Sequence, residues 1–252
     1  QYKPRFSNSW DEYRNSIWHR VGYISWGYEA VGRFTSWEQI ANYPIDNDRK
    51  GNRTVVPGDI MYKDQNNDGV INGMDQRPIG YRVDSTPTIN FGINLTASWR
   101  GFDLGMDWTG SGMTSWNQRY ETARPFQNDG NSPDEVLKDA WHLSNIWDAN
   151  SELIPGKYPM IRLNTDDTSA YDTSTFWTHN VTYIKLRNLE LGYTFPKTWL
   201  NKTGVSSLRL YVSGTNLLTI SNLSVMDPEC ASDNGLDYPP MRVINVGVNL
   251  KF

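Results

Sequence analysis

The sequence contains few of the residues that build metal clusters or covalent cross-links. Among its 252 residues are one cysteine and three histidines. A single cysteine, Cys230, excludes an intramolecular disulfide and a thiolate metal cluster. The histidines His19, His142 and His179 lie too far apart along the chain for a short metal-binding motif, so we interpret them as surface or packing residues.

Long apolar runs and an excess of positive charge are also absent. No apolar run approaches the ~20 residues of a membrane-spanning helix, and the mean hydropathy is -0.63. A helical membrane protein is therefore excluded, but a membrane β-barrel is not, because its strands are only half apolar. The net charge of -4 and the pI near 5.4 argue against a nucleic-acid-binding protein.

The N-terminus, "QYKPRFSNSW", has neither an initiator methionine nor the apolar core of a signal peptide. We therefore expect the chain to be processed or to be a fragment of a longer protein.

Several segments alternate between apolar and polar residues, as strands with two unlike faces do. In the final "VINVGVNLKF", every second residue from Ile244 to Phe252 is apolar. Residues 89–99 and 102–108 alternate in the same way on either side of Arg100-Gly101, which predicts a β-hairpin.

A second hairpin is predicted from residues 184–195 and 208–212. Its first arm changes phase near Asn188, as a β-bulge would cause. Residues 21–34 alternate more loosely, and together the patterns predict about six long strands.

The connections between these strands differ in length. Short turns are expected at Arg100-Gly101 and after Pro196, and the long polar connections are residues 34–86, 112–182 and 219–242. If the strands run up and down, the short turns fall at one end and the long connections at the other. That asymmetry is typical of outer-membrane barrels.

Two short helices are expected within the long connections. Thr35 and Glu38 have capping-box spacing and predict a helix that continues to Ala41. Apolar residues at helical spacing predict a second helix over Ser132–Trp147.

Two environments explain alternating strands: a soluble sandwich with its apolar faces inside, or a membrane barrel with its apolar faces toward lipid. Ten residues at ~3.4 Å each, tilted by ~45°, span about 24 Å, close to the ~25 Å apolar band of such barrels. The polar side chains at alternate positions of residues 90–98 and 245–249 also lack the charged mixture of a solvated strand face. We therefore expect an all-β fold, a transmembrane antiparallel β-barrel with long extracellular loops. Six strands are too few to close one, so either two strands are missed or the chain is part of a larger barrel.

The segment "DQNNDGVINGMD" predicts a calcium-binding loop. Alternation aims several oxygen ligands at one point, and glycine at the sixth position permits the sharp turn. The predicted ligands are the side chains of five residues and one backbone carbonyl: Asp64, Asn66, Asp68, Val70 (carbonyl), Asn72 and Asp75. A role in bracing a long loop is expected for this Ca²⁺; the alternative is an ion-free turn.

Aromatic residues are abundant, with 11 Trp, 14 Tyr and 8 Phe, and suit both membrane interfaces and sugar-binding surfaces. Five lie in the longest connection: Trp116, Tyr120, Trp141, Trp147 and Trp177. Stacking on a substrate and packing of loop against loop are both open, and the candidate substrate-binding residues are Trp116, Tyr120, Trp141 and Trp177.

A catalytic role is not expected. Gly110-Ser111-Gly112 lacks the spacing of a nucleophile elbow, and Asp166-Asp167 are interpreted as solvated charges on a polar loop.

Four stretches together resemble the C-terminal part of SusC/RagA-type TonB-dependent outer-membrane transporters of Bacteroidetes. They are "PGDIMYKDQNNDGVINGMDQRPIG", "TPTINFGINLTASWRGFDLGMDWTGSG", "YIKLRNLELGYTFPKTWL" and "SLRLYVSGTNLLTI", and the resemblance extends over roughly Val21 to Phe252.

The resemblance implies that residues 1–252 are the C-terminal portion of a barrel whose N-terminal plug and earlier strands are not in this chain. It further implies outer-membrane localisation in a Gram-negative bacterium, a SusD-like surface lipoprotein as partner, and TonB-driven import of an oligosaccharide or peptide. Phe252, a terminal aromatic residue, is implied to be an assembly signal. The alternative function is a secreted, calcium-stabilised β-sandwich that binds glycan.

Overall fold

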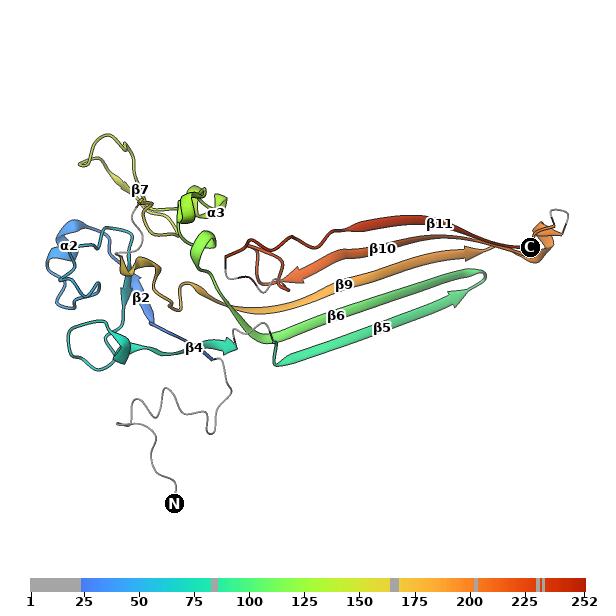
Figure 1. Ribbon diagram of the computed structural model, residues 1–252, viewed down its shortest axis with the longest axis horizontal. Helices are drawn as coiled ribbons and strands as arrows, with labels where there is room; N and C mark the ends of the chain where they lie inside the picture. Colours follow the sequence, from blue (N-terminus) through green and yellow to red (C-terminus); the bar gives the residue numbers. More distant parts are fainter. Residues whose placement is uncertain (1–23, 83–85, 164–167, 202–203, 230–231, 233) are drawn as a thin grey trace, which may run out of the picture. The chain divides into compact units, whose positions relative to one another are not determined.

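The computed structural model describes residues 24–82, 86–163, 168–201, 204–229, 232 and 234–252 (Figure 1). The described residues form two compact units. Unit 1 comprises those of Gln1–Ser85, Ser115–Asn180 and Ala231–Leu236, and unit 2 those of Thr86–Thr114, Val181–Cys230 and Asp237–Phe252. Asp166-Asp167, Cys230 and residues 21–23 of the loosely alternating segment lie outside the described residues.

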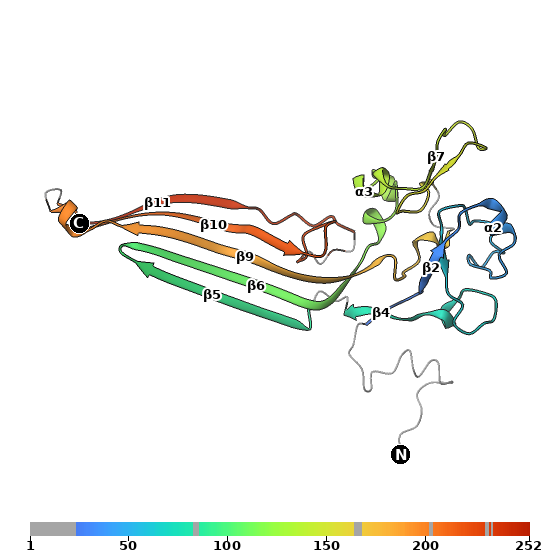
Figure 2. The same ribbon diagram turned by 180° about the vertical axis from the view of Figure 1, so that it is seen from behind.

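Long strands dominate unit 2 (Figures 1 and 2). They are β5 (Ile89–Trp99), β6 (Phe102–Asn117), β9 (Thr178–Thr194), β10 (Ser207–Ser221) and β11 (Val243–Lys251), and they are hydrogen-bonded in the order β5-β6-β9-β10-β11. β6 and β9 also contribute residues to unit 1. The predicted all-β class is confirmed, and no helix in the described ranges is long and apolar enough to cross a membrane.

Both predicted hairpins are confirmed. β5 pairs with β6 from Trp99↔Phe102 to Ile89↔Gly112 without interruption. The turn between them has positive φ at both residues, 48° at Arg100 and 91° at Gly101, as a two-residue turn matching the strand twist requires.

The predicted irregularity near Asn188 is also present. The pairing of β9 with β10 shifts register between Thr215 and Leu218, opposite Asn188 and Leu186. Consecutive residues of β9 then reach the same face of β6: Arg187 Nε donates to Thr109 Oγ1 at 3.2 Å and Asn188 Nδ2 to Asp107 Oδ2 at 3.1 Å. The extra residue of this irregularity lies in β10, which advances three residues where β9 advances two. At the same level β9 changes phase, and its polar side chains stay on one face.

Unit 1 contains short strands and a core of its own. The strands are β1 (Ile24–Gly27), β2 (Ala30–Arg33), β3 (Ile60–Tyr62), β4 (Arg77–Arg82), β7 (His142–Leu143) and β8 (Leu153–Ile154). β1 pairs with β4, β2 with β3, and β7 with β8. The principal core cluster includes Tyr28, Ile60, Tyr62, Tyr158 and Trp177.

The loosely alternating residues 21–34 do not form one long strand over their described part. The chain breaks between β1 and β2, where Tyr28 N donates to Thr173 O at 2.9 Å. Gly27 makes this close approach possible, because a Cβ there would lie 2.3 Å from the Thr173 carbonyl oxygen.

The helices are shorter than predicted, or begin at another residue. The first, α2 (Trp37–Ala41), is capped by Ser36, whose Oγ accepts from Gln39 N at 3.1 Å, one residue later than the Thr35 cap we predicted. The second, α3 (Asp134–Lys138), replaces the helix predicted over Ser132–Trp147. It ends because Ala140 forms a bridge with Tyr158 and the chain continues into β7.

The other helices in the described ranges are one-turn elements. They are α4 (Lys197–Leu200), η1 (Gly73–Asp75), η2 (Tyr120–Thr122), η3 (Gln127–Asp129) and η4 (Ser169–Tyr171).

Candidate functional site

One face of the unit 2 sheet is apolar and exposed. Its side chains include Ile93, Leu95, Leu191, Leu210, Val212, Ile244, Val246, Val248 and Leu250, which are between 42% and 79% exposed. They come from the positions that alternation assigned to one face of each strand. Burial of an exposed apolar surface of this kind is strongly favourable, so the face requires an apolar environment.

The opposite face carries charged side chains joined across strands. Arg209 of β10 donates to two carboxylates on two other strands: Nε lies 3.1 Å from Asp103 Oδ1 on β6, and Nη2 lies 2.6 Å from Glu190 Oε1 on β9. Gly192 leaves space for the guanidinium, since a Cβ there would lie 2.3 Å from Arg209 Nη2. Tyr211 similarly lies over Gly247.

A second group in the middle of this face, centred on a carboxylate, also joins three strands. Asp107 of β6 accepts from Asn94 of β5 and from Asn188 of β9, each at 3.1 Å. Amide and carboxylate side chains thus cross-link the strands on the polar face. These links are strong because hydrogen bonds to a charged group are stronger than those between neutral groups.

The third group holds the connection between β10 and β11 against β9. Lys185 is 1% exposed, and its Nζ lies 2.8 Å from Asp227 Oδ2 and 3.0 Å from Glu229 Oε2. Glu229 also accepts from Arg187 Nη2 and, at 3.0 Å, from the Tyr183 hydroxyl. Two cations therefore face two carboxylates, and the cluster is balanced in charge.

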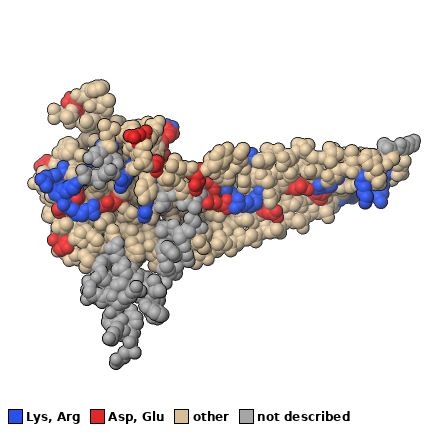
Figure 3. Space-filling model, in the orientation of Figure 1, with Lys and Arg blue, Asp and Glu red and all other residues tan. Residues whose placement is uncertain are grey.

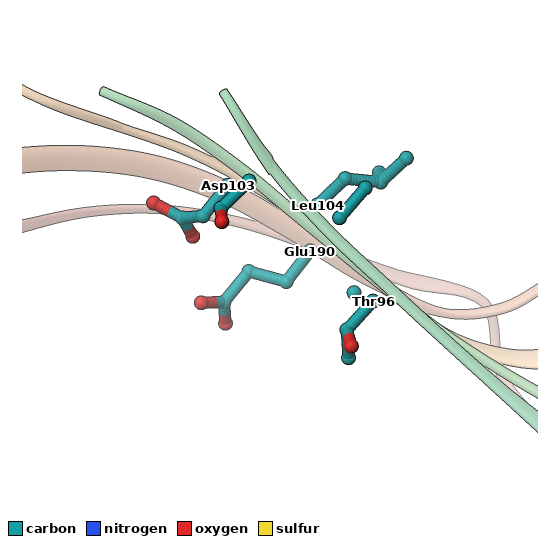
Figure 4. A pocket seen from close by; sticks show the side chains of 7 residues that line it. Thr96, Asp103, Leu104 and Glu190 are labelled. Carbon is teal, nitrogen blue, oxygen red and sulfur yellow. The ribbon is translucent and has the colours of Figure 1, made fainter. Parts of the chain in front are cut away.

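Two shallow cavities lie along this sheet. One, of about 410 Å³, is bordered by Asn90, Thr109, Tyr183, Arg187 and Glu229 among others. The other, of about 350 Å³, is shown in Figure 4, where the carboxylates of Asp103 and Glu190 point away from Leu104. Seen from one side, acidic and basic side chains follow each other along the sheet (Figure 3).

The charged networks are the functional feature that sequence reasoning missed. The polar face of β5 lacks charge, and that of β11 carries only Lys251 at its end, but β6, β9 and β10 between them carry charged side chains. The signal was present, because Asp103, Asp107, Glu190 and Arg209 all occupy the polar positions of their alternating runs.

The predicted calcium loop belongs to unit 1 and is closely bonded to itself. Asp64 accepts from the amides of Asn67 and Gly69, at 2.7 and 2.8 Å. Asp68 Oδ2 accepts from Asn66 Nδ2 at 2.8 Å and from Asn72 Nδ2 at 3.3 Å. The third, fifth and ninth positions of the loop therefore converge on one oxygen.

The loop fits a cation in part. Hydrogen bonds from the Val70 amide and the Asn66 side chain lower the pKa of Asp68 below its usual value, which favours the charged form. Asp75, in contrast, is fully buried and accepts from Gln65 N and Asn72 N, both at 2.8 Å. In the described ranges, no three His, Cys, Asp or Glu side chains group as a metal site.

This loop is fixed to the core of unit 1 at its eighth position. Ile71 is fully buried, and its amide donates to Asp46 O at 2.9 Å. The amide of Asp46 donates in turn to Gly69 O at 2.8 Å.

Three of the predicted substrate-binding residues are packed inside unit 1. Trp177 is 1% exposed and stacks between Tyr158 and Tyr171, with centroids 5.8 and 5.6 Å away. Trp116 is buried against His179, with ring centroids 5.6 Å apart. Trp141 is buried over Gly58, where a Cβ would lie 2.6 Å from its Cγ. These three indole rings therefore pack within unit 1.

Two aromatic residues of the same connection are exposed instead. Tyr120, also predicted to bind substrate, is 48% exposed, and Trp147, between β7 and β8, is 90% exposed. Neither takes part in the buried cluster, so both rings are open to a ligand or partner.

Sequence comparison finds relatives of greater length. The chain is 31% identical over 241 residues to TonB-dependent receptor P3 of Formosa agariphila, covering 89% of this chain and 22% of the relative. It is 26% identical over 246 residues to TonB-dependent receptor SusC of Bacteroides thetaiotaomicron, covering 93% of this chain and 20% of the relative. The chain thus spans about a fifth of these relatives. No family model matches it.

Comparison of folds gives a consistent result. The chain matches a RagAB peptide importer structure in a closed-closed state with a TM-score of 0.59 and 21% identity, over 91% of this chain and 23% of the other. An open-open RagAB structure matches with a TM-score of 0.58 and 22% identity, over 92% of this chain and 23% of the other.

Proposed function

This chain is related to the SusC-type TonB-dependent transporters, and on that premise we propose that it forms part of the wall of an outer-membrane transport barrel. The observation that carries the proposal is the two-faced sheet of unit 2. Its exposed apolar face suits lipid, and its polar face, cross-linked by Arg209, Asp107 and Lys185, suits a hydrated lumen.

The outer strands of this sheet support membership of a larger barrel. Among the described residues, β5 pairs only with β6, and β11 only with β10. An open edge is unfavourable in hydrocarbon, since its amide and carbonyl groups have no water to bind. We propose that residues 1–252 form a C-terminal portion, and that neighbouring strands and a plug belong to the same longer protein.

The proposed activity is import of an oligosaccharide or peptide across the outer membrane of a Gram-negative bacterium, together with a SusD-like lipoprotein and driven by TonB. The chain would contribute wall, lumen and outer loops, and no covalent chemistry. Tyr120, exposed in a long connection, is the proposed substrate contact of the four aromatic candidates, and Phe252 the proposed assembly signal.

Charge placed on each face of β11 tests the location. In the protein at its native length, Val246→Arg should destabilise the membrane-inserted state by about 2–4 kcal/mol, because it puts a cation on the lipid side. The matched control Asn245→Arg puts the same charge on the polar side. The measurement is the amount of protein recovered in outer membranes in a folded form, which is recognised by a shift of its gel mobility on heating.

Equal loss of inserted protein in both variants would contradict the proposed orientation. Wild-type protein in the soluble fraction would favour the secreted β-sandwich instead. Import is tested separately by growth: cells lacking the gene, or lacking TonB, should lose growth on the oligosaccharide or peptide that the wild type uses.

We also propose that the loop Asp64–Asp75 binds Ca²⁺. Rotation of the Asn66 and Asn72 amides would turn their oxygens toward the cation beside Asp68, with Asp64 and the Val70 carbonyl as further ligands. Anchorage through Ile71 would then transmit the bracing effect of the ion to unit 1. Asp75 would have to leave its amide partners to join them.

Calcium titration of the purified protein tests this proposal. Saturating Ca²⁺, at about a hundred times the Kd, should stabilise the wild type by about 2.7 kcal/mol against unfolding. The variant Asp68→Ala should lose most of that gain, whereas Asp134→Ala on exposed α3 should keep it. No calcium-dependent change in the wild type, or an equal change in Asp68→Ala, would reject the site.

A further inference from the structure

The end of unit 2 that carries the short turns presents exposed aromatic rings. Trp99 and Trp199 are each 67% exposed, and Phe102 is 50% exposed. Phe102, Tyr193, Phe195 and Trp199 form a continuous row, with successive ring centroids 4.6, 5.0 and 6.0 Å apart. We call the segments Trp99–Phe102, Tyr193–Leu200 and Leu250–Phe252 the short-turn rim.

Three exposed basic side chains belong to the same rim: Arg100, Lys197 and Lys251. Backbone hydrogen bonds hold its segments at one end of the sheet: Thr194 N donates to Gly101 O at 2.7 Å, and Ser206 N to Lys251 O at 2.6 Å. Basic side chains gather toward this end of unit 2 (Figure 3).

These positive charges are not neutralised by acidic side chains of the rim. In the rim and the described residues that flank it (98–103, 193–201, 204–208 and 250–252), the only acidic side chain is that of Asp103. Asp103 is already bound by Arg209, with Arg209 Nε 3.1 Å from its Oδ1. The rim therefore combines aromatic rings with exposed basic side chains that outnumber its acidic ones.

Arg100 occupies a position that its backbone does not favour. Its φ is 48°, in the left-handed region, where a side chain costs about 1 kcal/mol and where turns of this type prefer Asn or Gly. Its guanidinium carbon lies 4.9 Å from the centroid of the Trp99 ring. A strained residue that presents its charge beside an exposed ring indicates a role for that charge.

We propose that the short-turn rim binds the headgroups of anionic phospholipids. The proposal rests on the membrane location proposed above, where short turns lie on the periplasmic side. Trp99, Trp199 and Phe102 would lie at the boundary between hydrocarbon and water, and Arg100, Lys197 and Lys251 would contact the phosphate groups, as basic residues beside a negatively charged leaflet do.

The test compares lipid binding by charge variants of the protein at its native length. Wild-type protein, purified in detergent, is titrated with phosphatidylglycerol and with phosphatidylcholine, and bound lipid is counted by native mass spectrometry. Wild-type protein should prefer phosphatidylglycerol, and the triple variant Arg100→Gln, Lys197→Gln, Lys251→Gln should lose about fivefold in that preference for each charge removed. The charge-conserving variant Arg100→Lys, Lys197→Arg, Lys251→Arg should keep it.

A matched control removes the same charge from unit 1, through Arg53→Gln, Lys63→Gln and Lys138→Gln, and should retain the preference. The proposal is overturned if the neutral rim variant binds phosphatidylglycerol as well as the wild type, or if the control loses as much. Displacement of the lipid by inorganic phosphate at matched ionic strength would indicate a phosphate site and reject a lipid surface.

All variants are also inserted into phosphatidylcholine vesicles and tested for a heat-dependent shift in gel mobility. A neutral rim variant that inserts normally has lost headgroup binding and kept its fold. Failure of the wild type to insert into vesicles of any composition would contradict the proposed membrane location itself.

Discussion

Two buried aspartates of unit 1 have opposite electrostatic environments. Burial raises the pKa of Asp59 to about 6, even though Arg162 binds its carboxylate. Burial also acts to raise the pKa of Asp48, but hydrogen bonds from Thr54, Lys50 and Asn52 outweigh it and lower that pKa to about 2. Hydrogen bonds from a tight loop therefore decide the pKa of Asp48, whereas desolvation decides that of Asp59.

Asp48 should make unit 1 sensitive to acid. Its carboxylate accepts from Lys50 N and Asn52 N at 2.8 Å and from Thr54 N and Oγ1 at 2.7 Å. Because the pKa in the folded state lies below the ordinary value, its stabilisation of about 2 kcal/mol is present above about pH 4 and is lost as the pH falls through about 2.

The measurement is denaturant unfolding of unit 1 at several pH values, and its readout is hydrogen exchange in peptides around residues 46–54. Asp48→Asn should be less stable than the wild type at neutral pH by about 2 kcal/mol and lose less stability on acidification. The same steep acid dependence in wild type and variant would show that another carboxylate is responsible. The exposed Asp134→Asn serves as control, since it should follow the wild type.

At the scale of elements, the register shift between β9 and β10 decides which side chains meet. It brings Tyr183, Lys185 and Arg187, three alternate residues of β9, onto the polar face with Asp227 and Glu229. In a strand of unbroken alternation, these residues would lie on the face opposite to Asn188 and Glu190. One local irregularity thus assembles the polar networks.

Lys185 should hold the connection between β10 and β11 in place. Lys185→Met removes one of two cations and leaves Asp227 and Glu229 close together with Arg187 alone, which costs about 3 kcal/mol for a buried pair. Hydrogen exchange of the amides from Asn222 to Glu229 should rise strongly. Lys185→Arg should preserve protection.

The triple variant Lys185→Met, Asp227→Asn, Glu229→Gln separates charge from packing. It should recover part of the protection, because no unpaired carboxylate remains. If Lys185→Met leaves exchange over residues 222–229 unchanged, the ion cluster does not hold this connection.

For the whole molecule, the sequence was informative where a residue's environment repeats along the chain. Alternation predicted both hairpins, the turn at Arg100-Gly101 and the change of phase near Asn188, because every second residue of a strand meets the same solvent. The calcium loop stays a prediction, and it could be made because its candidate ligands are neighbours in sequence. These patterns are local, so one sequence is enough to detect them.

Unit 1 could not be predicted in the same way. The connections that bring together Trp177, Tyr158 and Tyr171 have no periodic pattern. No local signal therefore indicates that Trp177 is buried while Tyr120 is exposed. The helix predicted over Ser132–Trp147 failed for the same reason, since the bridge between Ala140 and Tyr158 overrides helical propensity. Partners on the polar face of unit 2 likewise depend on register between strands.

The place of Gly192 beneath Arg209 has a consequence for how this sheet can change over evolutionary time. Any side chain at 192 would displace the guanidinium, and so would leave Asp103 and Glu190 facing each other. Loss of Arg209 would in turn remove the reason to keep 192 small. We therefore expect substitutions at 192 and 209 to accompany each other among relatives more often than they occur alone.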